Sequence, residues 1–231
     1  MNILITGGSR GIGKAIAKSL AEDGHRIVII GRNPDSLEEA KKELGEHVQS
    51  YRADITSPEE VEALKQFLAD NFLPDGLVLS AAAFGDPATG RSVTEPSPEE
   101  LSEILNANVT ANYRLVRNLL PLLKNSGNAR VVIIGSTAGI RQDKGGIYGI
   151  SKWALQGYAS NLRAELKETG IGVSLVNPGG TFTERRKKDG AHDRHLAESS
   201  DFGILIAALF RMSPQAVLER VDLRPLAGDT Y

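Results

Sequence analysis

Cysteine is absent from all 231 residues, which excludes thiol catalysis, thiolate metal sites and disulfide bonds. An excess of charge of one sign is also missing, because 27 basic and 29 acidic side chains leave a net charge of −2. So weak a summed field does not attract nucleic acid or an anionic membrane, and we expect neither as a partner.

Long apolar runs are lacking as well. The two longest, Leu77 to Phe84 and Phe202 to Phe210, are each interrupted by a small or polar residue. Both fall far short of the roughly 20 residues that a membrane-spanning helix needs. The chain also passes from Met1 directly into the apolar segment Asn2 to Thr6, without the basic region and apolar stretch of a secretory signal. We therefore expect a soluble, cytoplasmic protein.

What the sequence contains is a regular alternation of short apolar runs with amphipathic segments. Its 41% hydrophobic and 24% charged residues suffice for one domain over residues 1–231 with a full core. The strand candidates are Asn2 to Thr6, Arg26 to Gly31, Val48 to Ala53, Gly76 to Ser80, Arg130 to Gly135, Gly172 to Asn177 and Ala216 to Leu223. The helix candidates are Gly11 to Glu22, Ser36 to Leu44, Pro58 to Phe72, Pro98 to Lys124, Ile147 to Glu168 and Ser200 to Arg211. This alternation predicts an α/β fold with a doubly wound parallel sheet and helices on both faces.

Residues 179–199 do not follow the alternation. The segment is rich in charge and long for a connection in a compact domain, which favours a mobile, substrate-binding lid. We interpret its basic run, Arg185 to Lys188, as a solvated face; the alternative is that it grips a phosphate or an acidic carrier on the substrate. His192 and His195 lack a supporting helix with a carboxylate, so no metal site is expected.

A glycine-rich turn, Thr6-Gly7-Gly8-Ser9-Arg10-Gly11-Ile12-Gly13, joins the first strand candidate to the first helix candidate. In that context glycines let the backbone approach a pyrophosphate closely, and the helix N-terminus offers unpaired N–H groups to the anion. The turn therefore predicts a dinucleotide site. The alternative is a turn whose glycines serve packing alone.

The end of the second strand candidate indicates which dinucleotide binds. NAD is usually met there by an acidic side chain on the adenine ribose, whereas the extra phosphate of NADP needs a cation. Here the strand ends Ile30-Gly31-Arg32-Asn33, and Arg10 in the glycine turn is a second cation. A planar guanidinium suits phosphate, so NADP is favoured. The alternative is that both arginines are merely solvated.

A phenol and an amine, Tyr148 and Lys152, lie four residues apart on one helix candidate. A phenol has a pKa of about 10 and is a poor proton donor or acceptor at neutral pH unless a cation favours its charged form. Positions i and i+4 share a helix face, so Lys152 can supply that cation. The pair predicts proton-transfer chemistry at Tyr148.

Together these features resemble the short-chain dehydrogenases and reductases in their single-domain form, over nearly the whole chain. The resemblance rests on the glycine turn, Ala53-Asp54-Ile55, Asn108 in Ala107-Asn108-Val109, Ser136 in Ile134-Gly135-Ser136, Tyr148 to Lys152, and Asn177-Pro178-Gly179 with Thr183. It implies a seven-stranded Rossmann sheet of order 3-2-1-4-5-6-7, a nicotinamide cofactor at the carboxyl ends of the strands, and interconversion of a carbonyl and an alcohol.

The resemblance also implies four catalytic residues. Tyr148 would give a proton to the carbonyl oxygen, which Ser136 would polarise by a hydrogen bond. Lys152 would bind the nicotinamide ribose and hold down the pKa of the phenol, and Asn108 would anchor a water that links Lys152 to solvent. Taken singly, Ser136 could instead cap a turn, Asn108 could satisfy helix backbone, and Lys152 could be a surface cation.

Cofactor binding is implied for a larger set. Asp54 would contact the adenine with Ile55 beside it, and Thr183 and the backbone after Pro178 would meet the nicotinamide carboxamide. The full set implied for NADP(H) is Gly7, Ser9, Arg10, Gly11, Ile12, Gly13, Arg32, Asp54, Ile55, Ala82, Tyr148, Lys152, Pro178, Gly179, Thr181 and Thr183.

The chain departs from the family at the fourth strand candidate. Where the family shows Asn-Asn-Ala-Gly, this sequence has Ser80-Ala81-Ala82-Ala83. The missing amides commonly brace the sheet and the cofactor channel. Ser80 must therefore replace one hydrogen bond, or the site is looser here.

The predicted function is that of an NADPH-dependent oxidoreductase, a carbonyl reductase acting on a small ketone, aldehyde or 3-oxoacyl-type substrate. The alternative is an NADP-binding regulatory or sensor protein without turnover. Hydrophobic side chains are scarce in the lid, which favours a polar or carrier-linked carbonyl over a steroid. By resemblance, Pro98 to Lys124 and Ile147 to Glu168 pair subunits, so we expect a homodimer or homotetramer.

Overall fold

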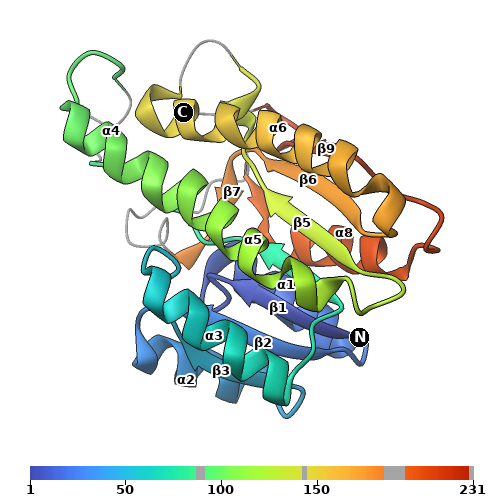
Figure 1. Ribbon diagram of the computed structural model, residues 1–231. Coiled ribbons are helices and arrows are strands. Elements are labelled where there is room, and N and C mark those ends of the chain that lie inside the picture. The colour runs from blue at the N-terminus through green and yellow to red at the C-terminus, as the bar shows by residue number, and fades with distance from the viewer. Residues whose placement is uncertain (87–91, 142–144, 185–195, 229–231) are drawn as a thin grey trace.

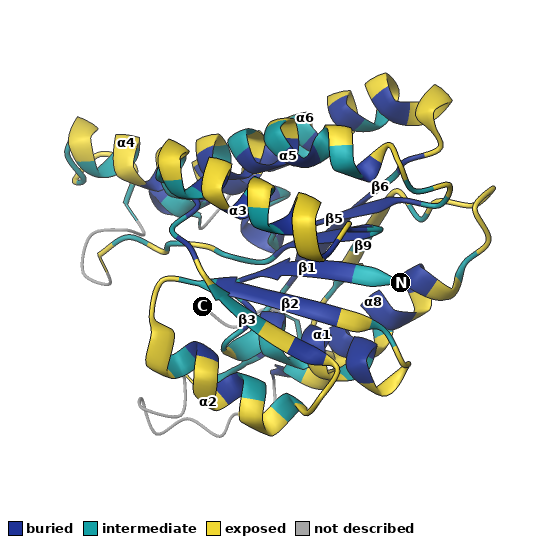
Figure 2. Cartoon of the chain, turned by 60° about the horizontal axis from the view of Figure 1, so that its bottom comes forward, coloured by how far each residue is buried: buried dark blue, intermediate teal, exposed yellow. Residues whose placement is uncertain are grey.

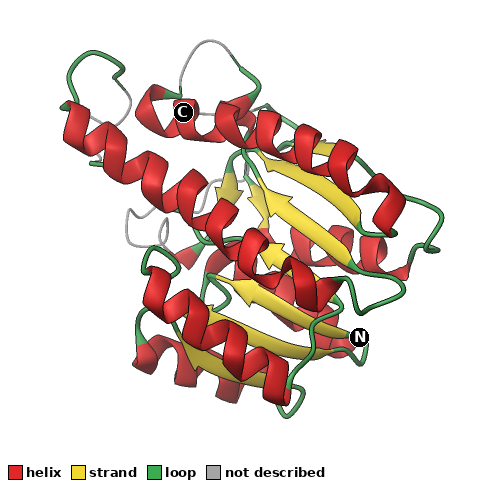
Figure 3. Cartoon of the chain, in the orientation of Figure 1, coloured by secondary structure: helices red, strands yellow, loops and turns green. Residues whose placement is uncertain are grey.

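Seven parallel strands form the central sheet of the computed structural model, which describes residues 1–86, 92–141, 145–184 and 196–228 (Figures 1 and 3). The strands are β1 (Asn2–Thr6), β2 (Arg26–Gly31), β3 (Val48–Arg52), β4 (Gly76–Leu79), β5 (Arg130–Ile134), β6 (Gly172–Pro178) and β9 (Arg220–Leu223). Their order is β3-β2-β1-β4-β5-β6-β9, so the predicted order is confirmed with β9 as the seventh strand. The last strand begins four residues later than predicted, at Arg220, because a turn between Ser213 and Ala216 precedes it.

Two layers of helices cover the sheet, as predicted. On one face lie α1 (Gly11–Glu22), α2 (Pro34–Leu44) and α8 (Ser199–Arg211); on the other lie α3 (Pro58–Asn71), α5 (Ala111–Leu123) and α6 (Gly146–Leu166). Alternate residues of a strand face opposite layers, so Leu4 packs with α3 and α5 while Ile3 and Ile5 pack with α1 and α8. Figure 2 shows the strands as mostly buried between helices whose outer faces are exposed.

The helix predicted from Pro98 to Lys124 is present, but a π-helical turn divides it. Helix α4 (Pro98–Leu105) begins with a capping box in which Ser97 and Glu100 satisfy each other's backbone N–H groups. A π-helical turn, Asn106–Thr110, then joins α4 to α5. A single turn of this kind inserts an extra residue into a helix and occurs often at functional sites. Apolar periodicity along the sequence does not reveal it.

The predicted lid contains a small element of regular structure. Strands β7 (Thr181–Phe182) and β8 (Ala197–Glu198) pair in parallel, which joins the two ends of the segment. The basic run Arg185 to Lys188, His192 and His195 lie outside the described residues. Two single turns of 3-10 helix, Thr137–Gly139 and Lys167–Thr169, complete the described elements. Within the described part of the chain, no helix is both long and apolar enough to cross a membrane.

Candidate functional site

The glycine turn lies at the carboxyl end of β1, and its shape requires glycine. Gly7 and Gly11 have φ angles of 66° and 54°, a region that other residues rarely adopt. A Cβ atom on Gly13 would lie 2.4 Å from the carbonyl oxygen of Gly7. The turn is therefore folded directly onto the first turn of α1, which brings its amides to the N-terminus of that helix.

This helix N-terminus already holds an anion from the chain itself. The N–H of Gly11 donates to Oε2 of Glu184 at 2.9 Å. A Cβ atom on Gly11 would also lie 3.4 Å from Cγ2 of Thr183, so the start of the lid packs against the turn. The Glu184 carboxylate stands in here for a phosphate oxyanion, because both accept from N–H groups and are stabilised by the helix dipole. The turn thus fits the pyrophosphate that the sequence predicts.

The end of β2, which Arg32 follows, lies beside the glycine turn. A Cβ atom on Gly31 would lie 3.8 Å from the Ser9 hydroxyl, so the end of β2 and the turn are neighbours. Arg10 and Arg32 are both exposed. Both arginines therefore belong to the two neighbouring segments at which an adenine ribose phosphate is expected.

Asp54 lies near this cluster and is ionised. Burial raises the pKa of Asp54, but hydrogen bonds from the backbone N–H and the hydroxyl of Thr56 and the charges of Arg32 and Arg52 outweigh it, so that the pKa lies below its usual value. The neighbouring Ile55 side chain is only 8% exposed and packs in the core. Beside an adenine, Ile55 would therefore present mainly its backbone.

The loop after β4 is braced in the absence of the family's amides. The buried hydroxyl oxygen of Thr6 accepts from the backbone N–H groups of Ser80 and Ala81, both at 2.9 Å. Ala82 is exposed at the same edge of the sheet. The bracing thus comes from Thr6, which the sequence places at the end of the first strand candidate and in the glycine turn without predicting these hydrogen bonds.

Asn108, in the π-helical turn, links this loop to α6. Its Oδ1 accepts from the N–H of Ala83 at 2.7 Å, and its Nδ2 donates to the carbonyl of Ala83 at 2.8 Å and to the Ser151 hydroxyl at 2.9 Å. The Ser151 hydroxyl in turn donates to the carbonyl of Tyr148 at 2.7 Å. The fully buried Asn108 amide therefore ties the loop after β4 to the helix turn that carries Tyr148.

Tyr148 and Lys152 meet on α6 as their spacing predicts. The Lys152 ammonium lies 5.4 Å from the centroid of the Tyr148 ring and donates to the carbonyl of Ile134 at 3.0 Å. Only 2% of Lys152 is exposed, and this burial lowers its pKa to about 8. Tyr148 itself is half-buried. A cation with little solvent around it thus lies beside the phenol.

The depressed pKa of Lys152 predicts a pH-dependent stability. Unfolding restores its ordinary value of 10.5, so between about pH 8 and 10.5 the unfolded chain binds more protons and stability rises with pH. Lys152 should raise the free energy of unfolding by about 3 kcal/mol over this range, and Lys152→Met should not show this rise. Urea unfolding of both proteins at these two pH values measures it. If the difference in the free energy of unfolding between the wild type and Lys152→Met is the same at both pH values, the lowered pKa of Lys152 is contradicted.

Ser136, at the carboxyl end of β5, is held by its own turn and by β6. Its N–H donates to Oδ1 of Asn177 at 3.2 Å, and its hydroxyl accepts from the N–H of Ala138 at 3.1 Å. Among the described residues, the acceptor for its hydroxyl proton is the carbonyl of Pro178, at a long 3.5 Å. Ser136 therefore caps the following 3-10 turn and still has a weakly engaged proton to donate.

The 3-10 turn brings Ser136 to the same place as the residues of α6. A Cβ atom on Gly139 would lie 2.6 Å from the carbonyl carbon of Lys152, and one on Gly149 would lie 3.2 Å from the carbonyl oxygen of Ala138. The turn and the helix backbone are therefore in direct contact. These contacts bring the turn that Ser136 begins, the Asn108 amide and the helix turn with Tyr148 and Lys152 together near the carboxyl ends of β4 and β5.

Sequence reasoning missed the role of the Asn177 side chain. Besides accepting from Ser136, its Oδ1 accepts from Nε2 of Gln156 at 2.9 Å, and its Nδ2 donates to Oδ1 of Asp222 at 2.7 Å. A Cβ atom on Gly135 would lie 2.1 Å from the same Oδ1, which explains the glycine. The signals in the sequence were a polar residue at the end of an apolar strand candidate and its place in the motif Asn177-Pro178-Gly179.

The segment after β6 completes the carboxyl edge. Pro178 is buried, the N–H of Gly179 donates to the carbonyl of Leu223, and the Thr181 hydroxyl donates to the carbonyl of Gly179 at 2.9 Å. These contacts fix the backbone that leads to Thr183 and the glycine turn. In the described residues, no group of three or more histidine, aspartate or glutamate side chains is placed to hold a metal ion.

Comparisons with known proteins agree on one group. A family model described as short chain dehydrogenase matches residues 1–194. The uncharacterized oxidoreductase YciK of Escherichia coli is 32% identical over 193 residues, covering 80% of this chain and 75% of that protein. A short chain dehydrogenase of Shigella flexneri complexed with NADP aligns with a TM-score of 0.86 at 28% identity, covering 95% of each chain. Actinorhodin polyketide ketoreductase with NADPH aligns with a TM-score of 0.86 at 25% identity, covering 99% of this chain and 97% of that one.

Proposed function

Because the chain belongs to the short-chain dehydrogenase family, we propose that it is an NADP(H)-dependent oxidoreductase that reduces a small ketone, aldehyde or 3-oxoacyl-type carbonyl to an alcohol. The observation that carries this proposal is the buried Lys152 ammonium, 5.4 Å from the centroid of the Tyr148 ring. A cation held there favours the charged form of the phenol, which gives Tyr148 a reason to exchange a proton near neutral pH.

The proposed mechanism assigns a role to each of the four candidate catalytic residues. Bound NADPH supplies the hydride that reduces the carbonyl carbon. Tyr148 donates its hydroxyl proton to the carbonyl oxygen, and Ser136 donates a hydrogen bond to that same oxygen. Lys152 stabilises the phenolate left on Tyr148. Asn108 holds the helix turn of Tyr148 in register with the loop after β4, and anchoring of a water for proton relay remains part of its proposed role.

NADP(H) is the proposed cofactor on two grounds. The similar short chain dehydrogenase of Shigella flexneri was solved with NADP, and actinorhodin polyketide ketoreductase was solved with NADPH. Both structures support this choice. The turn at Gly11 already accommodates an oxyanion, and Arg10 and Arg32 are exposed beside it. We assign Asp54 to the adenine, and Pro178, Gly179, Thr181 and Thr183 to the nicotinamide end.

Replacing Arg32 with Ala tests the choice between NADP and NAD. We expect the Kd of NADPH to rise by about 10- to 100-fold, because a charge-assisted hydrogen bond to phosphate is lost, while that of NADH changes by less than about twofold. Calorimetric titration of both nucleotides measures the effect. Arg26→Ala, at the other end of β2, is the control. Equal weakening of both nucleotides contradicts the role of Arg32.

The reaction itself is tested by following NADPH absorbance with a panel of ketones, aldehydes and 3-oxoacyl thioesters. Steady oxidation that depends on the added carbonyl supports the proposal. Tight binding of NADPH without oxidation by any of these classes would instead favour a regulatory or sensor protein. Comparison of turnover with NADPH and NADH in the same assay shows which nucleotide the protein uses.

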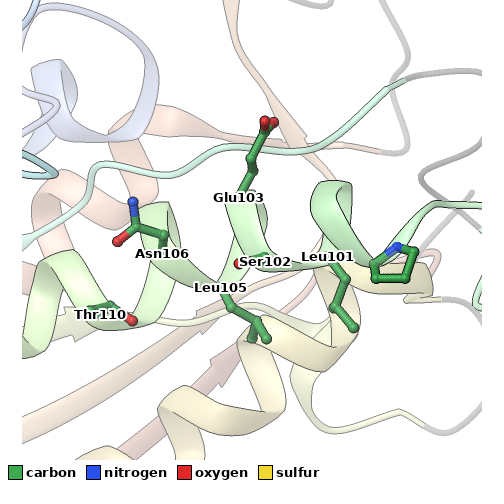
Figure 4. Close-up of a pocket in the computed structure, with 7 residues that line it drawn as sticks. Leu101, Ser102, Glu103, Leu105, Asn106 and Thr110 are labelled. Carbon is green, nitrogen blue, oxygen red and sulfur yellow. The ribbon is translucent and has the colours of Figure 1, made fainter.

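Subunit pairing through α4 to α6 remains a proposal, as does a cytoplasmic location. Three large apolar side chains are exposed on these helices, with Tyr113 51%, Ile150 41% and Trp153 47% exposed. An open hollow of about 500 Å³ follows α4 and the π-helical turn, lined by Pro98, Leu101, Ser102, Glu103, Leu105, Asn106 and Thr110 (Figure 4). Light scattering distinguishes the expected homodimer or homotetramer from a monomer.

A further inference from the structure

A second aromatic ring lies against the candidate proton donor. The rings of Phe84 and Tyr148 are stacked, with centroids 5.0 Å apart and an angle of 18° between their planes. This separation is within the range that aromatic pairs favour. Phe84 belongs to the loop after β4, so the stack joins two distant segments of the chain. Nevertheless 49% of Phe84 remains exposed.

The backbone on both sides of Phe84 is fixed. The Asn108 side chain forms hydrogen bonds with both the N–H and the carbonyl of Ala83, the residue before Phe84. Gly85, the residue after it, has a φ of 79°, which favours glycine. The same Asn108 amide reaches the carbonyl of Tyr148 through the Ser151 hydroxyl. One buried side chain therefore anchors the backbone at Tyr148 and next to Phe84.

The half-exposed ring of Phe84 lies against the phenol that a substrate carbonyl must reach. A carbonyl that receives a proton from Tyr148 places its oxygen about 2.7 Å from the phenol oxygen. The groups bonded to the carbonyl carbon then lie only a few ångströms from the ring that covers Tyr148. A flat aromatic substituent gains both burial of apolar surface and ring–ring attraction at such a surface, whereas a puckered aliphatic ring gains only the first.

We infer that Phe84 is a specificity-determining residue that selects carbonyls bearing an aromatic ring next to the carbonyl group. The inference rests on the proposed function, because it concerns the substrate of the Tyr148 site. It also narrows that function: the apolar surface beside the phenol favours an aryl carbonyl over the polar or carrier-linked one that the composition of the lid suggests.

The test compares benzaldehyde with cyclohexanecarbaldehyde, which have the same number of carbons but differ in flatness. Intrinsic reactivity cancels when the kcat/KM ratio for the two aldehydes is compared between proteins. Phe84→Leu keeps an apolar side chain without a ring. We expect it to lower the benzaldehyde preference by about 10-fold, chiefly through KM for benzaldehyde. Leu73→Ala, at a residue that is also 49% exposed, is the control and should leave the ratio unchanged.

A binding experiment with unreactive amides tests the role of Phe84 without turnover. Benzamide and cyclohexanecarboxamide are titrated by calorimetry into the NADP-loaded protein, and Phe84→Leu is expected to weaken benzamide binding about 10-fold and the other amide little. An unchanged aldehyde ratio, an equal loss for both aldehydes, or equal affinities of the two amides for the wild type would overturn the inference. Absence of NADPH oxidation with every carbonyl is a different result, which removes the proposed reductase function while the amide titration still decides the role of Phe84.

Discussion

Tyr148→Phe is expected to lower kcat for carbonyl reduction by about 10³- to 10⁴-fold, the upper range for loss of a general acid. The substitution removes one hydroxyl and keeps the ring, so the stack on Phe84 and the contact with Lys152 are retained. NADPH binding should therefore stay within about threefold of the wild type, because the other cofactor contacts remain and the lost hydroxyl acts mainly in the reaction. Steady-state turnover at saturating NADPH and calorimetric titration measure the two quantities.

The control for this prediction is another Tyr-to-Phe change. Tyr51 lies on β3, near the edge of the sheet away from α6, and packs on Phe67. Tyr51→Phe should leave kcat unchanged within about twofold if the loss at Tyr148 is chemical. Retention of more than about a tenth of wild-type turnover by Tyr148→Phe contradicts a general-acid role for this residue.

Gly13→Ala should raise the Kd of NADPH by about 100-fold or more, since a shift of about 1 Å in a positioning element can cost that much. The new Cβ atom would lie 2.4 Å from the carbonyl oxygen of Gly7, and backbone on both sides of the contact cannot rotate away. The turn must therefore move off α1, and its amides no longer face the pyrophosphate together. Calorimetric titration with NADPH measures the loss.

Two further variants test whether the loss of NADPH binding comes from the glycine turn. Gly127→Ala adds the same methyl group where no atom would lie within 4 Å, and NADPH binding should be unaffected. Ser9→Asp places a negative charge in the turn without a new backbone contact, and it should also weaken NADPH strongly if phosphates bind here. NADPH affinity that survives both Gly13→Ala and Ser9→Asp would move the cofactor away from the glycine turn.

The parallel sheet with its two helix layers and the position of the glycine turn could be predicted because they depend on local patterns, whereas the order of the strands followed from the resemblance to the family. Continuous apolar runs such as Arg26–Gly31 indicate strands buried on both faces, and regular alternation with helices leaves few topologies. The proximity of Tyr148 and Lys152 follows from helix geometry alone. Each of these predictions uses residues within one element or between consecutive elements.

The contacts that join distant elements could not be predicted in this way. The π-helical turn depends on how α4 and α5 pack, and it carries the Asn108 amide that bonds Ala83 and Ser151. The network of Asn177 with Ser136 and Asp222 likewise spans strands far apart in sequence. The stacking of Phe84 on Tyr148 belongs to the same class. No periodicity or spacing encodes such pairs, because they arise only when the sheet is assembled.

The proposed reaction is tested most directly by the fate of the transferred hydrogen. NADPH carrying deuterium at the transferable position of the nicotinamide ring is incubated with the wild-type protein and each carbonyl of the panel, and the products are analysed by mass spectrometry. The account predicts an alcohol that carries a single deuterium on the former carbonyl carbon, and its loss with Tyr148→Phe. NADPH bound to the protein but no labelled alcohol from any carbonyl would contradict it.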